Sequence, residues 1–232
     1  MQIVEVSVTG VRSAVITLQR SQTPMRFVLF PMLHLGDPAF YRSVSARLRD
    51  CDLVVAEGVS GRSAVTAALT LAYRLPGRSP RLGLVVQGID YEALGVPVIC
   101  PDITAGQLGQ RWRSVPVLHR LAAACLIPSV ALAIRLYGTR RFLARYWTME
   151  DLPSGQQERL RAMAPEATEL LLDYRDTLLV RALASIHETR MNEPVDVAVV
   201  YGAAHMPAVT QEMSARFGYR PRAAEWVPVF DF

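Results

Sequence analysis

Hydrophobic residues gather in short runs along the chain, and these runs predict buried strands. The clearest run covers residues 195–200, which are mostly apolar and rich in valine, as in strands buried on both faces of a sheet. Gly202 then allows a sharp turn, and Pro207 suits the first turn of a helix. His205 therefore lies where a strand gives way to a helix, at the edge where open α/β sheets bind ligands.

The remaining pattern alternates between strand-like and helix-like segments. Strands are expected at residues 2–8, 13–18, 26–30, 53–56 and 96–100, with an extended tail at 219–230. Helices are expected at 38–49, where Asp37 can cap the first turn, from near Arg62 to Pro76, at about 84–94, at 166–190, and from Pro207 to Phe217.

This order of elements predicts an α/β fold with three layers, in which a mostly parallel central sheet lies between helices. Helical pattern continues from Thr104 onward and is broken by several prolines, which indicates a helical insertion at about 104–165. Neither a repeat nor a linker divides the sequence. We therefore expect one domain over residues 1–232.

The composition is that of a folded protein with a dispersed basic surface. Of the 232 residues, 51% are hydrophobic and 20% are charged, which excludes a disordered chain. The net charge of +4 comes from arginine alone, because the sequence contains no lysine, so chemistry that needs a lysine nucleophile is excluded. The arginines are scattered, and we expect no nucleic acid as a partner. The absence of lysine also favours a bacterial, GC-rich source.

Cysteines and hydrophobic stretches favour a cytoplasmic protein. The three cysteines, Cys51, Cys100 and Cys125, form no paired motif and are expected to be buried, reduced thiols. The start of the chain lacks the layout of a signal peptide. The most hydrophobic stretch, residues 121–134, is too short to span a bilayer and contains Pro128. A buried helical hairpin is the favoured interpretation, and a lid or a membrane-surface contact is the less favoured one.

Four residues with useful chemistry follow the ends of expected strands. They are His34, Glu57, Asp102 and His205. If those strands are parallel neighbours, their ends are about 5 Å apart per strand, and the side chains project into one crevice. Two imidazoles and a carboxylate also form a ligand set for a catalytic metal ion. Each residue has a plain structural interpretation as well, as a helix start, a solvated strand end or a helix cap.

Arg175 is the fifth candidate. It lies in the apolar stripe of the long helix at 166–190, together with Leu171, Leu178 and Ala182. An inward-facing arginine needs an anionic partner, because an unpaired buried charge is very costly. That partner is Asp102, Glu57 or a substrate carboxylate, unless the arginine serves only a structural salt bridge. The neighbouring Asp176 either steers Arg175 or pairs across to another helix.

Several short motifs together resemble the TraB/PrgY/Tiki family. They are Pro31-Met-Leu-His34, Val55-Ala-Glu57-Gly, Gly202-Ala-Ala-His205 and Tyr174-Arg-Asp176, and they occur in the family's order. The strand that leads to Asp102, with Arg111-Trp112 after it, fits as well. One departure is Pro31, which replaces the glycine of the first Gly-x-x-His motif. Proline fixes φ and removes an N–H donor, so the turn that presents His34 is expected to differ.

The resemblance implies a metal-dependent hydrolase. His34 and His205 would hold a divalent ion (manganese, cobalt or zinc), and Glu57 would be a further ligand or the general base. The ion would activate water to attack an amide or ester carbonyl of a peptide or small-molecule substrate. Arg175 would stabilise the oxyanion or anchor a carboxylate, and Asp102 would orient a neighbour.

Two alternatives remain open at this stage. One is a metal-free hydrolase like the erythromycin esterases, with a histidine or Glu57 as general base. The other is a binding protein for a peptide or haem that has no catalytic activity. Assembly into a homo-oligomer also stays open.

Overall fold

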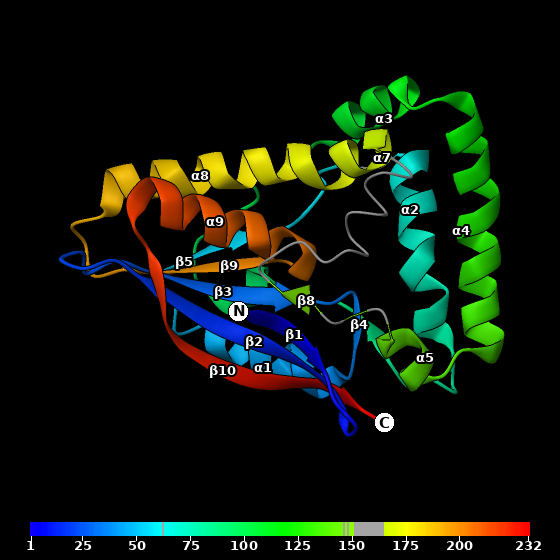
Figure 1. Cartoon of the computed structure of the whole chain (residues 1–232), viewed down its shortest axis with the longest axis horizontal. Coiled ribbons are helices and arrows are strands. Elements are labelled where there is room, and N and C mark those ends of the chain that lie inside the picture. The colour runs from blue at the N-terminus through cyan, green and yellow to red at the C-terminus, as the bar shows by residue number, and fades with distance from the viewer. Residues whose placement is uncertain (62, 146, 148, 151–164) are drawn as a thin grey trace.

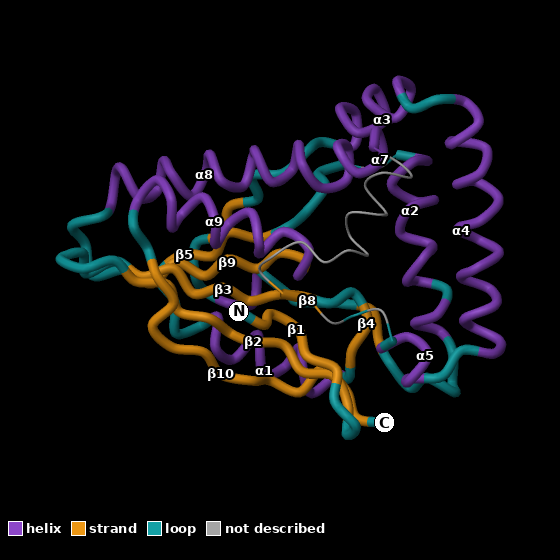
Figure 2. The backbone as a smooth tube through the Cα atoms, viewed as in Figure 1, coloured by secondary structure: helices purple, strands orange, loops and turns teal. Residues whose placement is uncertain are grey.

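The computed structural model of the chain describes residues 1–61, 63–145, 147, 149–150 and 165–232. Figure 1 shows its helices and strands in chain order, and Figure 2 shows most of the strands gathered into one twisted sheet. The last part of the helical insertion expected at 104–165 falls at 151–164, which lies outside the described residues, as does the helix start expected at Arg62.

A mixed sheet forms the centre of the protein. In the described part of the chain it runs in the order β7-β5-β9-β3-β2-β1-β8, with β10 on the other side of β2. The parallel strands are β3 (Arg26–Met32), β5 (Leu53–Ala56), β7 (Val98–Ile99) and β9 (Asp196–Gly202). The antiparallel strands are β1 (Gln2–Val6), β2 (Gly10–Gln19), β8 (Met149–Glu150) and β10 (Arg220–Asp231). A separate pair consists of β4 (Leu35–Gly36) and β6 (Val85–Val86).

Helices cover the sheet on both faces, as the sequence predicts for a three-layer α/β fold. Figure 1 shows α8 (Tyr174–Arg190) and α9 (Met206–Phe217) on one face and α1 (Pro38–Leu48) on the other. Beyond the sheet stand α2 (Ala64–Arg74), α3 (Ala105–Ser114), α4 (Val117–Tyr137) and α5 (Arg140–Ala144). A short helix α7 (Pro165–Thr168) and a π-helical turn (Glu169–Asp173) lead into α8.

The parallel strands are apolar because both of their faces are covered. Residues 197–201 of β9 are fully buried, and so are Val54, Val55 and Ala56 of β5. This is the reason why these strands read as nearly continuous hydrophobic runs instead of alternating ones. The hairpin expected at the start of the chain is confirmed, because β1 and β2 pair antiparallel.

The predicted helix at 84–94 is wrong. That segment contains the short strand β6 and a single 3₁₀ turn, Glu92–Leu94. Gly88 and Asp90 disfavour a continuous helix there, and pairing with β4 satisfies the backbone of Val85 and Val86 instead. The Asp37 cap is also wrong in detail: Asp37 occupies the N-cap position of α1, but its carboxylate binds Arg140.

The buried helical hairpin expected at 121–134 is wrong as well. This stretch belongs to α4, one continuous helix of 21 residues that passes through Pro128 and has only Ala131 buried. The proline removes one backbone hydrogen bond, but the helix continues because the neighbouring alanine and leucine residues have high helix propensity. By length and composition, α4 is the one helix in the described chain that is long and apolar enough to cross a bilayer.

The expectation that all three cysteines are buried holds only for Cys51. Cys100 and Cys125 are exposed, and all three are free thiols. Cys100 follows the very short strand β7 directly, and Cys125 lies at an exposed position of α4.

Candidate functional site

The carboxyl ends of the parallel strands form one edge of the sheet, and the candidate residues lie along it. Glu57 follows β5 directly, Asp102 follows β7 after two intervening residues, and His205 ends a 3₁₀ turn (Ala203–His205) that follows β9. The parallel pairing of β5 with both β9 and β7 sets these strand ends side by side. Glu57, Asp102 and His205 are therefore neighbours, as the sequence predicted.

Arg175 joins two of the carboxylates. Its Nη2 atom donates to Glu57 Oε1 at 2.6 Å and to Asp102 Oδ2 at 2.5 Å, and its Nε atom donates to Asp102 Oδ1 at 2.8 Å. The Asp102 side chain is fully buried, whereas Arg175 and Glu57 are 12% and 13% exposed. The expectation that Arg175 faces inward toward an anion is confirmed, and its partners are Asp102 and Glu57.

Backbone amides fix both carboxylates in place. Asp102 accepts hydrogen bonds from the N–H groups of Gly58 and Ile103, at 3.1 and 2.7 Å. Glu57 Oε2 accepts from the N–H of Gly202 at 2.7 Å. The cap role considered for Asp102 belongs instead to Thr104, whose side chain forms a capping box with Gln107. The Asp102 side chain therefore binds Arg175 and does not cap the helix.

His205 lies between two carboxylates. Its Nδ1 atom is 2.6 Å from Asp176 Oδ1, and its Nε2 atom is 3.7 Å from Glu57 Oε1. The His205 side chain is 3% exposed and Asp176 is 14% exposed. A continuous line of alternating charge results, from Asp176 through His205, Glu57 and Arg175 to Asp102.

This arrangement sets the protonation of the site. Burial alone would lower the pKa of His205, but the contacts with Asp176 and Glu57 raise that pKa to about 9. Burial alone would raise the pKa of Glu57, but His205 and the Arg175 guanidinium hold it well below its ordinary value. At neutral pH the site therefore contains an imidazolium flanked by carboxylates.

His34 lies at the same edge but outside this line. It follows β3, which ends at Met32, and its ring stacks on Tyr73 with the ring centroids 4.5 Å apart. The residue is exposed, yet desolvation by the protein around the ring lowers the pKa of His34, against the opposing charge of Glu57. Pro31, the departure from the motif, lies inside β3, where its carbonyl accepts a hydrogen bond from Ser13.

The described residues show no preformed metal site. No group of three or more His, Cys, Asp or Glu side chains in that part of the chain is gathered as ligands. Glu57 Oε1, which would face the ion, already binds the Arg175 cation. The assignment of His34, Glu57 and His205 as metal ligands therefore stays a prediction.

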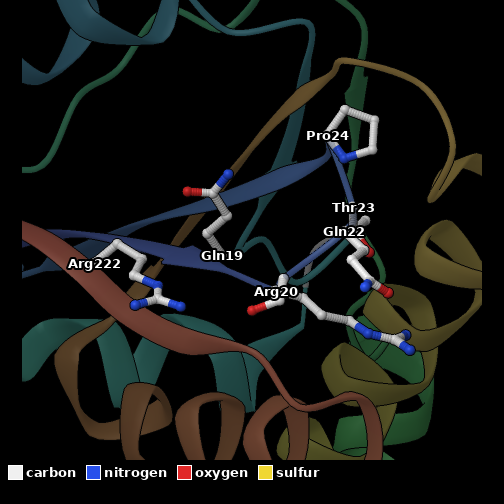
Figure 3. Close-up of a pocket in the computed structure, with 7 residues that line it drawn as sticks. Gln19, Arg20, Gln22, Thr23, Pro24 and Arg222 are labelled. Atoms are coloured by element: carbon white, nitrogen blue, oxygen red, sulfur yellow. The ribbon is translucent and has the colours of Figure 1, made fainter.

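Two depressions in the surface differ in their relation to this site. A groove of about 560 Å³ runs between α8 and α9 and reaches the site through Asp176 in its wall. The other, shown in Figure 3, is formed by the turn between β2 and β3 together with Arg222 of β10. That turn leads into the amino end of β3, so it lies at the opposite edge of the sheet from His205.

Sequence reasoning missed two partners at the site. The sequence left Asp176 either to steer Arg175 or to pair across a helix, and it did not indicate His205 as the partner. Tyr73, which stacks on His34, gave no signal in the sequence, because it comes from the distant helix α2.

Comparison of the chain with protein-family models, with curated proteins and with solved structures gave no match. The resemblance to the TraB/PrgY/Tiki family thus stays a prediction that depends on the motifs alone.

Proposed function

We propose that the protein is a hydrolase that cleaves an amide or ester bond of a peptide or small-molecule substrate. The observation that supports the proposal is the line of paired charged groups at the sheet edge. Within it, the Glu57 carboxylate and the His205 imidazolium lie 3.7 Å apart. Paired groups with opposite shifts in pKa are typical of acid–base catalysis. The groove between α8 and α9 has Asp176, the partner of His205, in its wall.

The protonation states suggest a division of roles. Glu57, as a carboxylate, accepts a proton from water, and the water oxygen attacks the carbonyl carbon. The His205 imidazolium donates its proton to the leaving nitrogen or oxygen, and the bond to that atom breaks. Glu57 then returns its proton to His205, which restores the resting state. Asp176 holds the imidazole ring through Nδ1, so that Nε2 faces the reacting groups.

Arg175 is a positioning residue in this scheme. Its guanidinium is already bound to Asp102 and Glu57, so its main effect is to orient the Glu57 carboxylate. We expect Arg175→Ala to lower kcat more than it raises KM. Arg175→Lys should restore only part of the rate, because lysine lacks the planar fork that binds both carboxylates.

A metal-dependent hydrolase is the second candidate. It is favoured by the Asp176–His205 contact, because histidines that bind metal commonly donate their other ring N–H to a carboxylate. His205 and Glu57, with His34, would hold the ion, which would supply an activated water. We include a cytoplasmic location in the proposal, supported by three free thiols, two of them exposed.

The test is hydrolysis of chromogenic esters and of a mixed peptide library by purified protein. Glu57→Gln and His205→Ala should each lower kcat/KM by at least about a hundredfold. His119→Ala, at a surface position outside the site, is the matched control and should keep the full rate. An unchanged rate in Glu57→Gln would overturn the proposal.

The same assay separates the two candidates. Full activity after dialysis against a chelator supports the metal-free scheme. Activity that is lost on chelation and restored by manganese, cobalt or zinc supports the second candidate, provided that His205→Ala also loses bound metal by elemental analysis.

A further inference from the structure

Helix α4 exposes an unusually apolar surface. Over 18 of its residues the mean hydropathy is 1.9, yet only 6% of that window is buried. The described chain exposes fourteen large hydrophobic side chains, and α4 supplies eight of them. These are Val117, Leu118, Leu121, Leu126, Val130, Leu132, Leu136 and Tyr137. Exposed large apolar side chains in this number along one helix indicate an interaction site.

Positive charge surrounds this apolar surface at both ends. Residues 103–149 contain seven arginines and neither aspartate nor glutamate. Arg113 and Arg120 lie toward the start of α4, and Arg135, Arg141 and Arg145 lie toward its end. Among the described residues, Glu166 lies next to the helix, with its carboxylate 3.7 Å from His119. An apolar helix with basic ends matches the chemistry of an anionic membrane surface.

We propose that α4 binds the surface of an anionic lipid bilayer, with its leucines among the acyl chains and its flanking arginines at the headgroups. The inference is independent of the proposed hydrolase activity. It replaces the buried hairpin that the sequence suggested.

The carboxyl end of α4 is tied to the fold, which favours a helix lying on the bilayer over one that crosses it. The carbonyl of Arg135 accepts from Ser79 Oγ at 2.9 Å, and the carbonyl of Leu136 accepts from Arg81 at 2.9 Å. Figure 1 shows α4 running alongside α2. A crossing orientation would require these contacts to break.

The charges also argue against a second copy of the chain as the occupant. Both ends of α4 are basic, so a parallel pair and an antiparallel pair would each bring arginines against arginines. Like charges opposed across an interface disfavour association. An anionic bilayer meets both basic ends favourably.

Flotation of the full-length protein with vesicles tests the proposal. Wild type should bind vesicles that contain phosphatidylglycerol at least about tenfold more strongly than pure phosphatidylcholine vesicles, and added salt should weaken that binding. Leu126→Glu with Leu132→Glu should abolish it. Val8→Glu, at an exposed apolar site away from α4, is the matched control and should bind as wild type does.

Circular dichroism checks that the double variant is folded. Arg141→Gln with Arg145→Gln, at exposed positions, provides a second and milder test and should weaken binding to the anionic vesicles alone. Failure of wild type to float, or equal flotation of the double variant, would overturn the proposal. So would an α4-dependent dimer in sedimentation velocity that binds no vesicles.

A fluorophore on Cys125 reports the depth of the helix. Cys125 is exposed on α4, whereas Cys51 is buried, and burial raises the pKa of its thiol to about 11. Cys100→Ser therefore directs labelling to Cys125. Quenching by lipids labelled near the headgroup should exceed quenching by lipids labelled at the acyl chain end. The reverse order would indicate a crossing helix and contradict a surface location.

Discussion

The edge of the sheet and helix α4 place their side chains in opposite ways. At the edge, five charged groups lie nearly buried and each has a partner within the chain. On α4, eight large apolar side chains lie exposed. In the first region, partners within the fold compensate the charges that folding buries, so its stability depends on the fold alone. The second leaves its apolar surface to be covered by the surroundings. Changes at the two sites should therefore affect stability very differently.

The largest effect is expected from Arg175→Ala. This change leaves the buried Asp102 and Glu57 carboxylates without their cation and should lower the free energy of unfolding by about 3–5 kcal/mol. Chemical denaturation measures it. The matched control is Arg26→Ala, which removes an exposed pair with Asp196 and should cost less than about 1 kcal/mol. Similar decreases in the free energy of unfolding in both variants would mean that the buried network contributes no more to stability than an exposed ion pair.

The second effect concerns alkaline pH. Because the pKa of His205 is raised to about 9, its contribution to stability is full below its unfolded pKa of about 6.5 and is lost as pH rises through 9. That contribution is on the order of 3 kcal/mol. Thermal unfolding between pH 6 and 10 should show the decline in wild type, and His205→Gln should flatten it. A decline of equal size in His205→Gln would assign the effect to another group.

Glu57 should act at the acid end. Its lowered pKa means that the stability it contributes is present above its ordinary pKa and is lost as pH falls toward the folded value.

A smaller effect is expected from Asp176→Asn. The asparagine can still accept from His205 Nδ1 but carries no charge, so the pKa of His205 should fall toward its ordinary value, at a cost of about 1–2 kcal/mol. Titration of the imidazole by NMR measures the shift. Glu188→Gln, an exposed change on the same helix, should leave the titration of His205 unaltered.

The smallest effect is expected on α4. Leu126→Gln at an exposed position should change the free energy of unfolding by no more than about 0.5 kcal/mol. By contrast, Leu179→Ala, on the buried face of α8, should cost about 2–5 kcal/mol. A loss above about 1 kcal/mol in Leu126→Gln would show that this face of α4 packs within the folded chain.

The parallel strands and the inward-facing Arg175 were predictable because burial on both faces leaves a direct mark on the sequence. The strand β9 reads as a valine-rich run, and the apolar residues around Arg175 show that it must face inward. The interaction of the Asp37 side chain was not predictable. Its carboxylate binds Arg140, which lies about a hundred residues away in the sequence, instead of capping the helix. The burial of helix α4 was predicted wrongly for a related reason. The sequence of an apolar helix does not indicate whether protein or lipid covers it.

The π-helical turn at Glu169–Asp173 affects how the long helix packs against two separate hydrophobic clusters. Leu170 belongs to a small cluster with Ile103 and Leu108, whereas Leu179 and Leu183 belong to the main core. Nine residues of regular α-helix separate Leu170 from Leu179 by about 180°, on opposite sides of the rod. One extra residue in a widened turn reduces that angle to about 80°. The widened turn thus changes the direction in which Leu170 faces relative to Leu179, and the helix contributes to both packing centres.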